Sequence, residues 1–151
     1  MRRNRFWIVA VCALAPAACA GEAGPPPGAE PAPTAGMARL YVYREVNPTG
    51  SPIWTMVSLD RRPLGQAEPG TVFYRDVPPG TYEVEVRSDK LYPNQFKTVR
   101  LAAGSRTFVK IGELPAWGNS PWGWQGTTFV VTIVEPALGA QEIAPLRPSP
   151  G

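Results

Sequence analysis

The stretch TYEVEVR, residues 81–87, alternates between apolar and charged side chains. Successive side chains of a β-strand point to opposite faces of the sheet, so this pattern predicts a strand with one buried face and one wet face. Tyr82, Val84 and Val86 belong to the buried face, whereas Glu83 and Glu85 belong to the face in water. Such a pattern is typical of an antiparallel sheet that packs on one side only.

Six further segments around this strand are rich in β-branched and aromatic residues and are bounded by Gly, Pro, Asn or Asp. They are ARLYVYREV, SPIWTMVSLD, GTVFYRDV, NQFKTVRLA, SRTFVKIGEL and GTTFVVTIVE, all within residues 38–135. No segment keeps a 3.6-residue period, so we predict an all-β fold, an antiparallel β-sandwich of about seven short strands. The last strand contains FVVTIV, residues 129–134, which is apolar on both faces and therefore predicts a strand that is central or covered on both sides.

The start of the chain has the layout of an export signal. Three arginines within residues 2–5 precede an apolar run, residues 6–18, that is too short to span a bilayer. The sequence Ala17-Ala18-Cys19 resembles the lipobox of bacterial lipoproteins, in which the cysteine is acylated and becomes the first mature residue. Pro16 departs from that pattern, which prefers an aliphatic residue there. The alternative is ordinary cleavage after Ala20, which would give a soluble periplasmic or secreted protein.

The lipoprotein resemblance implies a lipid anchor on Cys19 and a place in the bacterial cell envelope. Because Ala20 is not aspartate, it further implies the outer membrane, with the domain facing the periplasm. Residues 21–36 are rich in proline and glycine and predict an extended, semi-rigid tether. The expected organisation is a signal peptide at 1–18, an anchor and linker at 19–36, a β-sandwich at 37–136 and a weakly structured C-terminal tail at 137–151.

The charge balance limits the possible partners, and the cysteine content limits the possible disulfides. The 15 basic residues include the three arginines of the signal, so 12 basic residues face 12 acidic ones in the rest of the chain. This balance gives no reason to expect a nucleic-acid partner. The two cysteines are Cys12 and Cys19, and Cys12 lies inside the signal, so we expect no internal disulfide.

The chain contains no histidine, which excludes serine–histidine and cysteine–histidine catalysis and any imidazole metal site. Asp60 and Asp76 are the carboxylates nearest to predicted turns, and we interpret both as turn residues. A hydrolase that uses these two carboxylates is the less favoured alternative. We therefore predict a protein that is not an enzyme and that holds no metal and no cofactor.

Three stretches carry a resemblance to a known family. ARLYVYRE (38–45), VSLDRRPLG (57–65) and GTVFYRDVPPGTYEVEV (70–86) resemble the bacterial domain of unknown function 2846 family. The resemblance covers most of residues 38–135 and implies a small exported sandwich, often lipid-anchored, akin to transthyretin-like and carboxypeptidase-regulatory-like domains. It implies no established activity and no catalytic residues. Arg61 stands where the family has a turn glycine, which predicts a different turn type in that hairpin.

Aromatic residues offer two candidate surfaces. In PAWGNSPWGWQG, residues 115–126, turn-forming residues surround Trp117, Trp122 and Trp124. This loop either closes an open end of the sandwich, stacks on sugar rings with hydrogen bonds from Asn119 and Gln125, or contacts a membrane interface. The strands carry a second aromatic set, for which a buried core role is favoured over a sugar-stacking platform. That set is Tyr41, Tyr43, Phe73, Tyr74 and Tyr82.

Together these patterns predict a cell-envelope lipoprotein, tethered to a membrane, that acts as a non-catalytic binding or structural module. The expected partners are the membrane through the lipid anchor, and either cell-wall polysaccharide or an envelope protein. Two alternatives stay open. One is a scaffold subunit that joins an envelope complex by pairing a sheet edge, and the other is a carbohydrate-binding module that uses the tryptophan loop.

Overall fold

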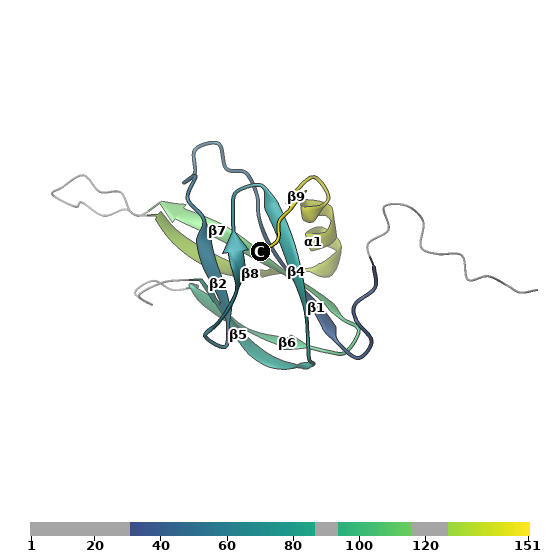
Figure 1. The fold of residues 1–151 in the computed structure, drawn as a ribbon. Coiled ribbons are helices and arrows are strands. Elements are labelled where there is room, and N and C mark those ends of the chain that lie inside the picture. Colours follow the sequence, from purple (N-terminus) through teal and green to yellow (C-terminus); the bar gives the residue numbers. More distant parts are fainter. Residues whose placement is uncertain (1–30, 87–93, 116–126) are drawn as a thin grey trace, which may run out of the picture. The chain divides into compact units, whose positions relative to one another are not determined.

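The computed structural model describes residues 31–86, 94–115 and 127–151, and the strands in this part of the chain form two sheets that pack face to face (Figure 1). The elements are β1 (Ala38–Arg44), β2 (Thr55–Leu59), β3 (Arg62–Ala67), β4 (Thr71–Val77), β5 (Gly80–Val86), β6 (Phe96–Leu101), β7 (Arg106–Pro115), β8 (Thr127–Val134), α1 (Pro136–Ile143) and β9 (Arg147–Pro148). The predicted all-β sandwich is confirmed.

The two sheets differ in how their strands pair. Sheet A has the order β8-β7-β1-β4-β9, and sheet B has the order β3-β2-β5-β6. All pairs in sheet B are antiparallel. In sheet A, β1 runs parallel to β7 and β4 runs parallel to β9, so this sheet is mixed where we expected antiparallel pairing throughout. The central strand is β1, the first strand of the domain.

All seven predicted strands form, and β3 is one of two strands that the sequence did not predict. Its sequence RPLGQA contains proline and glycine, which disfavour strands, so the sequence indicated a turn here. The strand forms because Asp60 and Arg61, with φ of 48° and 65°, make a two-residue turn that returns the chain onto β2. Positive φ at both central residues is the signature of a type I′ hairpin. The expected change of turn type at Arg61 is therefore wrong, because the arginine adopts the conformation that glycine favours.

The space between the sheets holds the larger hydrophobic core. Its members lie at alternate positions of their strands, and β5 shows this clearly. Val84 and Val86 are buried and Tyr82 packs against them, as the alternation predicted. Each fully buried aliphatic side chain contributes about 1.5–3 kcal/mol to folding. The other buried members are Ala38, Leu40, Val42, Val57, Leu59, Ala67, Phe73, Val99, Leu101, Val109, Ile111, Phe129 and Val131.

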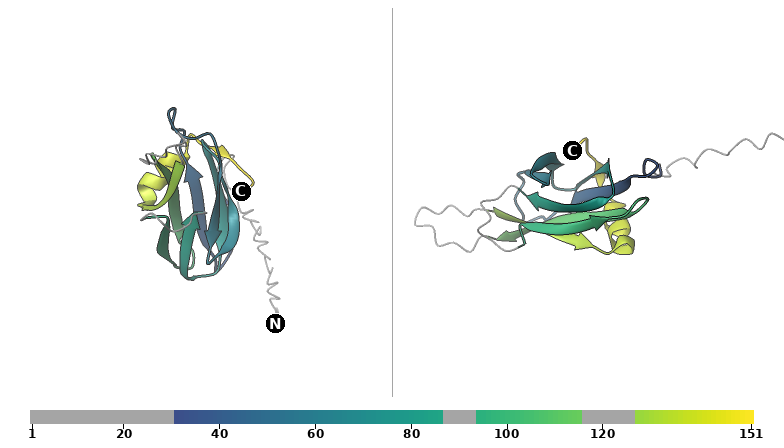
Figure 2. Two further views of the ribbon diagram at one scale, coloured as in Figure 1. Left: turned by 90° about the vertical axis from the view of Figure 1, so that its left-hand side faces the viewer. Right: turned by 90° about the horizontal axis from the view of Figure 1, so that it is seen from below.

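A second, smaller core lies on the outer face of sheet A, where α1 covers it. Tyr41, Tyr43 and Phe108 are buried there, and Ile143 and Leu146 pack against them. Figure 2 shows the helix on the outer side of the β-structure. With sheet B on one face and α1 on the other, every residue of β1 is buried.

The C-terminal residues differ from the weakly structured tail that we expected at 137–151. The Glu135 side chain accepts hydrogen bonds from the N–H groups of Ala137 and Leu138, at 3.0 and 3.1 Å, and so begins α1. This helix has only eight residues, which is too short to show a helical period in the sequence. Its stability comes from packing on sheet A. Among the described residues, no helix is long and apolar enough to cross a membrane.

We expected β8 to be central or covered on both sides, and the second alternative holds, because β8 is an edge strand of sheet A whose two faces both contact a hydrophobic core. Phe129 and Val131 enter the core between the sheets, and Val134 packs against the core beneath the helix. The outer edge of β8 is also hydrogen-bonded. The N–H of Val131 donates to the carbonyl of Asn94 at 2.7 Å, and this bond links sheet A to the residues before β6. The opposite side of the sandwich, between β3 and β4, is the open one.

Candidate functional site

Two groups of predicted site residues lie outside the described part of the chain. The lipidation site, Cys19, falls within residues 1–30, and the tryptophan loop falls within residues 116–126. The loop residues in question are Trp117, Asn119, Trp122, Trp124 and Gln125. The three alternative roles of this loop therefore stay predictions.

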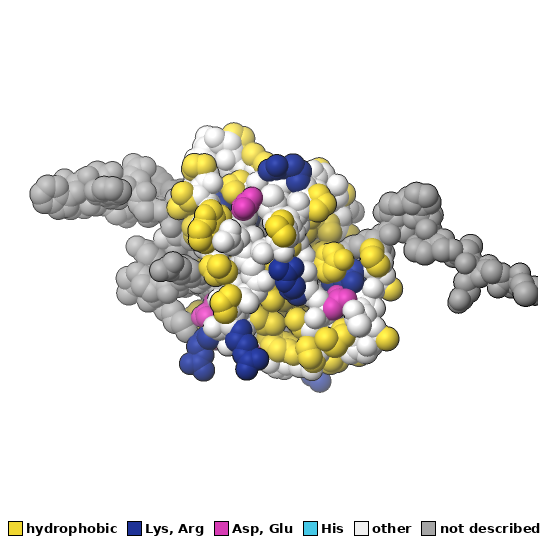
Figure 3. All heavy atoms as spheres, viewed as in Figure 1, with side chains coloured by type: hydrophobic (Ala, Val, Ile, Leu, Met, Phe, Trp, Pro, Cys, Tyr) yellow, Lys and Arg dark blue, Asp and Glu magenta, His cyan; other side chains and the backbone are white. Residues whose placement is uncertain are grey.

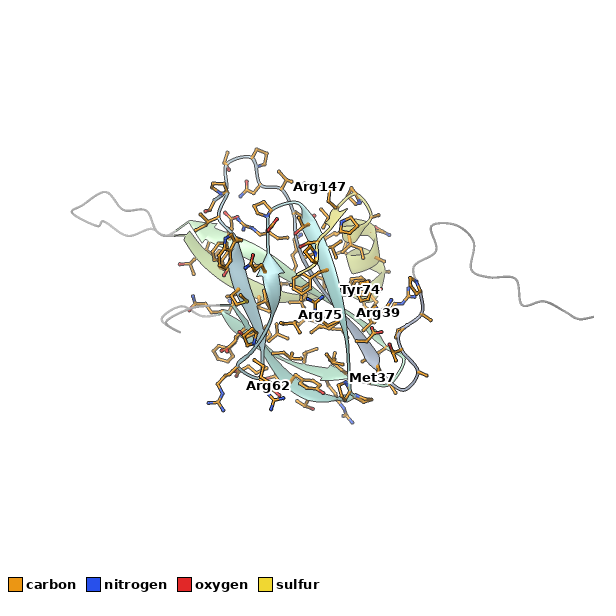
Figure 4. All side chains as sticks on the ribbon, viewed as in Figure 1. Met37, Arg39, Arg62, Tyr74, Arg75 and Arg147 are labelled. Atoms are coloured by element: carbon orange, nitrogen blue, oxygen red, sulfur yellow. The ribbon has the colours of Figure 1, made fainter. Side chains whose placement is uncertain are left out.

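The aromatic residues of the strands belong mainly to the interior. Tyr41, Tyr43 and Phe73 are buried, which confirms the core role favoured for them. The Tyr41 ring stacks on Phe108 with ring centroids 4.6 Å apart. Tyr74 is the most exposed member of the set, and its ring lies under the Arg39 guanidinium, 4.0 Å from the centroid (Figure 4). These rings do not form a shared platform for a sugar.

Asp76 is a strand residue and not the turn residue that the sequence suggested. It lies in β4 directly opposite Arg39 of β1. The Arg39 Nε donates to Asp76 Oδ1 at 2.7 Å and Nη2 donates to Oδ2 at 2.9 Å, a two-pronged ion pair. The backbone N–H and the hydroxyl of Thr34 both donate to Asp76 Oδ2 at 2.8 Å. The carboxylate thus ties the segment before β1 to the sheet.

The charges of this pair are strongly stabilised. The hydrogen bonds from Arg39 hold the pKa of the Asp76 carboxyl well below its usual range, and the Thr34 donors add to the effect against the opposing influence of burial. The same hydrogen bond raises the pKa of the Arg39 guanidinium above its ordinary value. Asp76 therefore stays ionised at physiological pH and cannot serve as a proton donor there.

Asp60 is a turn residue, as predicted, and its carboxylate also has a structural use. Its Oδ1 accepts from the N–H of Glu83 at 2.8 Å, and its own N–H donates to the Glu83 carbonyl at 2.9 Å. The β2–β3 turn is thereby fixed to β5. Asp60 and Asp76, the two carboxylates of the alternative hydrolase, thus both accept hydrogen bonds from other groups of the protein.

A polar cluster lies at the other end of β1, on the face of sheet A that packs against sheet B, where the Arg44 guanidinium lies 4.9 Å from the centroid of the Phe129 ring. The buried guanidinium of Arg44 forms an ion pair with Glu113 and donates to the carbonyls of Ser51 and Ile53, both at 2.5 Å. Because Glu113 Oε2 also accepts from the Ser51 N–H at 2.7 Å, this pair anchors the β1–β2 connection to β7. Burial lowers the pKa of the Arg44 guanidinium.

A second polar cluster, on the opposite face of sheet A, joins α1 to the sheet. The Tyr43 hydroxyl donates to Glu142 Oε2 at 2.5 Å, and Lys110 Nζ donates to the same oxygen at 3.1 Å. Burial and this hydrogen bond raise the pKa of Tyr43, while the donors lower the pKa of Glu142. Both shifts move away from neutrality, so neither group is tuned for acid–base catalysis at physiological pH. Among the described residues, no three acidic or cysteine side chains gather in a way that could hold a metal ion.

The open side of the sandwich contains a groove of about 500 Å³ between the β2–β3 hairpin and the start of β5. Figure 3 shows hydrophobic side chains in a hollow in the lower half of this face, with basic side chains at its borders. The groove is mainly apolar, with one acidic and one basic side chain at its rim. Its lining is Leu59, Asp60, Arg62, Pro63, Leu64, Val77, Pro78 and Tyr82.

Sequence reasoning missed this groove because its lining comes from three separate segments. Of the lining residues, only Tyr82 carried a signal in the local sequence, because the alternation of residues 81–87 placed it on the buried face of β5. In the structure its ring reaches the end of the core, and its hydroxyl donates to the Pro78 carbonyl at 2.8 Å. This bond fixes the β4–β5 connection, which forms one wall of the groove.

A short extended segment, Arg147–Gly151, lies next to the groove along the outer edge of β4, and we call it the strap. The N–H of Arg147 donates to the Gly70 carbonyl at 3.1 Å, and the N–H of Ser149 donates to the Val72 carbonyl at 2.9 Å. Figure 1 shows this yellow segment leaving α1 and running to the C label in front of the strands. The strap reaches the side of the groove, because Gly151 lies close to Gly65, the residue that follows Leu64 of the groove lining.

Comparisons with family models, with curated proteins and with solved structures found no match to this chain.

Proposed function

We propose that this chain is a membrane-tethered, non-catalytic binding module of the bacterial cell envelope, and that the groove on the open side of the sandwich is its ligand site. The observation that carries the proposal is the groove itself. Its volume of about 500 Å³ falls within the usual range for small-molecule and cofactor sites. Its walls are apolar with few polar groups, which is the composition that such sites share.

The chemistry of the rim narrows the ligand. Arg62 is exposed and, among the described residues, makes no ion pair, so its charge is available to a ligand. Asp60 at the same rim is already held by the Glu83 N–H. The groove therefore suits a ligand with an apolar body and an anionic group.

The tether in the proposal rests on the sequence. The basic and apolar start, the lipobox-like Ala17-Ala18-Cys19 and the proline-rich residues 21–36 favour a lipid anchor joined to the sandwich by a spacer. The resemblance to the domain of unknown function 2846 family is consistent with such an exported module and remains a prediction. Two acyl chains on one cysteine would anchor the chain stably.

The dye 8-anilinonaphthalene-1-sulfonate tests the groove, because it combines an aromatic body with one negative charge. We expect its fluorescence to rise on binding the wild-type chain and its affinity to fall about tenfold in Arg62→Glu, since attraction becomes repulsion at the rim. Arg106→Glu is the matched control, because Arg106 is an exposed arginine at the start of β7, outside the groove.

Near-ultraviolet circular dichroism of each variant must match the wild-type spectrum, because the dye also binds loosely packed states. Equal affinities in the two variants would show that the dye binds elsewhere. That result would contradict the proposal that the groove is the ligand site.

The tether has a separate test in the two cysteines of the chain. We expect Cys19→Ser to abolish incorporation of radiolabelled palmitate and to move the protein from the membrane fraction to the soluble fraction. Cys12→Ser is the control, and it should leave both unchanged because Cys12 lies within the predicted signal. Membrane recovery and labelling that survive in Cys19→Ser would contradict lipidation at this residue.

A further inference from the structure

The strap is held mainly by its backbone. Its two N–H···O=C bonds join it to Gly70 and Val72, as in a parallel strand pair. A third contact comes from Arg75, whose Nη2 donates to the Pro150 carbonyl at 2.8 Å while Nη1 donates to the Tyr74 carbonyl at 2.9 Å. The side chains add little, because four of the five strap residues are exposed.

The register of the strap explains its composition. The N–H groups of Arg147 and Ser149 point at β4, so Pro148 and Pro150 stand at the alternate positions, where no N–H is needed for the ladder. The segment ends on Gly151, whose φ of 77° is a conformation that favours glycine. The site on β4 that the strap occupies, which we call the seat of the strap, therefore suits an extended sequence of the form X-Pro-X-Pro-Gly.

The surface beneath the strap is built for close contact. Gly151 lies against Phe73 of β4 and Gly65 of β3, and a Cβ at Gly65 would approach the Phe73 ring to 2.7 Å and the backbone of Gly151 to 2.8 Å. Phe73 is 3% exposed with the strap in place. Release of the strap would expose the Phe73 ring. The site that the strap had occupied would then be continuous with the groove, and the two would form one surface along β4.

The few contacts of the strap favour its local opening. A segment with exposed side chains and few backbone hydrogen bonds opens locally at a small fraction of the free energy of global unfolding. By the alternation of the ladder, the N–H and C=O groups of Tyr74 and Asp76 face the same edge as those of Val72. The edge of β4 therefore continues past the strap toward the groove, and Arg75 blocks its next position by occupying the Tyr74 carbonyl.

We propose that the seat of the strap is a peptide-binding site, in which an extended X-Pro-X-Pro-Gly segment of a partner protein replaces the strap and adds to β4 as a parallel strand. This rests on the proposed function, because residues beyond the glycine would enter the groove. The partner's backbone supplies the bonds that the strap makes now, which is recognition by strand addition. Arg75 and Arg62, which Figure 4 shows below Arg147 on the same face, favour acidic residues in that continuation.

The test uses the full chain and a fluorescein-labelled peptide of sequence APLRPSPG, which corresponds to residues 144–151. Ser149→Pro removes the N–H that donates to the Val72 carbonyl, whereas the matched control Ser149→Ala keeps it. We expect fluorescence anisotropy to show peptide binding about tenfold tighter to Ser149→Pro than to Ser149→Ala, because the weakened strap competes less. The peptide APLRPPPG, which lacks the same N–H, should not bind either chain.

Equal binding of both peptides, or no binding to Ser149→Pro while its circular dichroism stays native, would overturn the proposal. Dimers of the wild-type chain that persist in Ser149→Ala and vanish in Ser149→Pro would assign the seat to a second copy and also overturn it. If the peptide fails while the sulfonate dye still binds at Arg62, only this inference falls, and the proposed groove site stands.

A measurement on the wild-type chain keeps the test valid should Ser149→Pro fail to fold. Hydrogen exchange should release the Ser149 amide long before the amides of β1, because only local opening is required. Exchange of Ser149 as slow as that of β1 would mean that the strap does not open, and would overturn the proposal.

Discussion

Asp76→Asn is expected to destabilise the domain by about 3 kcal/mol. The reason is the environment of Arg39, whose side chain is only 3% exposed. The variant keeps the shape of Asp76 but removes its charge, so a buried guanidinium loses its carboxylate. Unfolding in urea at pH 7, followed by circular dichroism, measures the change in the free energy of unfolding.

The effect should depend on pH in a defined direction. Arg39 holds the folded-state pKa of Asp76 below the value of an unfolded aspartate, which is about 4. The stabilisation by the charge is therefore complete above that unfolded value and is lost as the pH falls through the lower folded-state pKa. The difference between wild type and Asp76→Asn should be constant from about pH 5 to 8 and should shrink below about pH 4.

Asp60→Asn is the control for this experiment. Asparagine keeps a side-chain oxygen for the Glu83 N–H and tolerates the positive φ at this position, so we expect little change in stability. If Asp76→Asn costs no more than Asp60→Asn, the ion pair with Arg39 does not hold the domain together as described.

Gly139→Ala is expected to destabilise the domain by about 2 kcal/mol, although the same change within an exposed helix would be favourable by about 1 kcal/mol. Gly139 is the point where α1 touches sheet A. A Cβ there would lie 2.4 Å from Phe108 Cγ and 2.5 Å from Phe108 Cβ. These atoms lie near the backbone of β7, so rotation of the side chain cannot move them aside, and the helix itself has to shift.

Gln141→Ala is the matched control, since Gln141 is exposed in the same helix and alanine favours helix formation there. It should leave the urea midpoint unchanged or slightly raised, whereas Gly139→Ala should lower it. A Gly139→Ala variant that is more stable than the wild-type chain would contradict the close packing of α1 on Phe108.

The strands were predictable from the sequence because their signals are local. Alternation in residues 81–87 and β-branched runs elsewhere reflect a sheet with one buried face. The same local patterns did not show which strand lies at the centre of sheet A. β1 is the central strand although it carries Arg39 and Arg44, and both side chains are buried because carboxylates from β4 and β7 neutralise them. Those partners are distant in sequence, so no local pattern contains this information.

The candidate site was not predictable for a related reason. The groove needs the β2–β3 turn, and that turn depends on an arginine at positive φ that sequence reasoning assigns to glycine. The strap reads as a proline-rich end without structure, because only its register on β4 shows why proline is acceptable at 148 and 150. The predicted tryptophan loop, by contrast, is conspicuous in the sequence and lies outside the described residues.

The position of β1 at the centre of sheet A has a mechanical consequence. Residues 32–34 are joined to β1 through a turn at Ala35 and Gly36, and Thr34 and Arg39 are both bound to Asp76. A pull on the chain before this point acts first on the bonds to Asp76 and then on β1, which ladders to β4 and β7 hold on both sides. The hydrogen bonds of both ladders share that load, whereas an edge strand under the same pull could peel away one bond at a time. A domain attached through this strand would resist tension where it is most strongly connected.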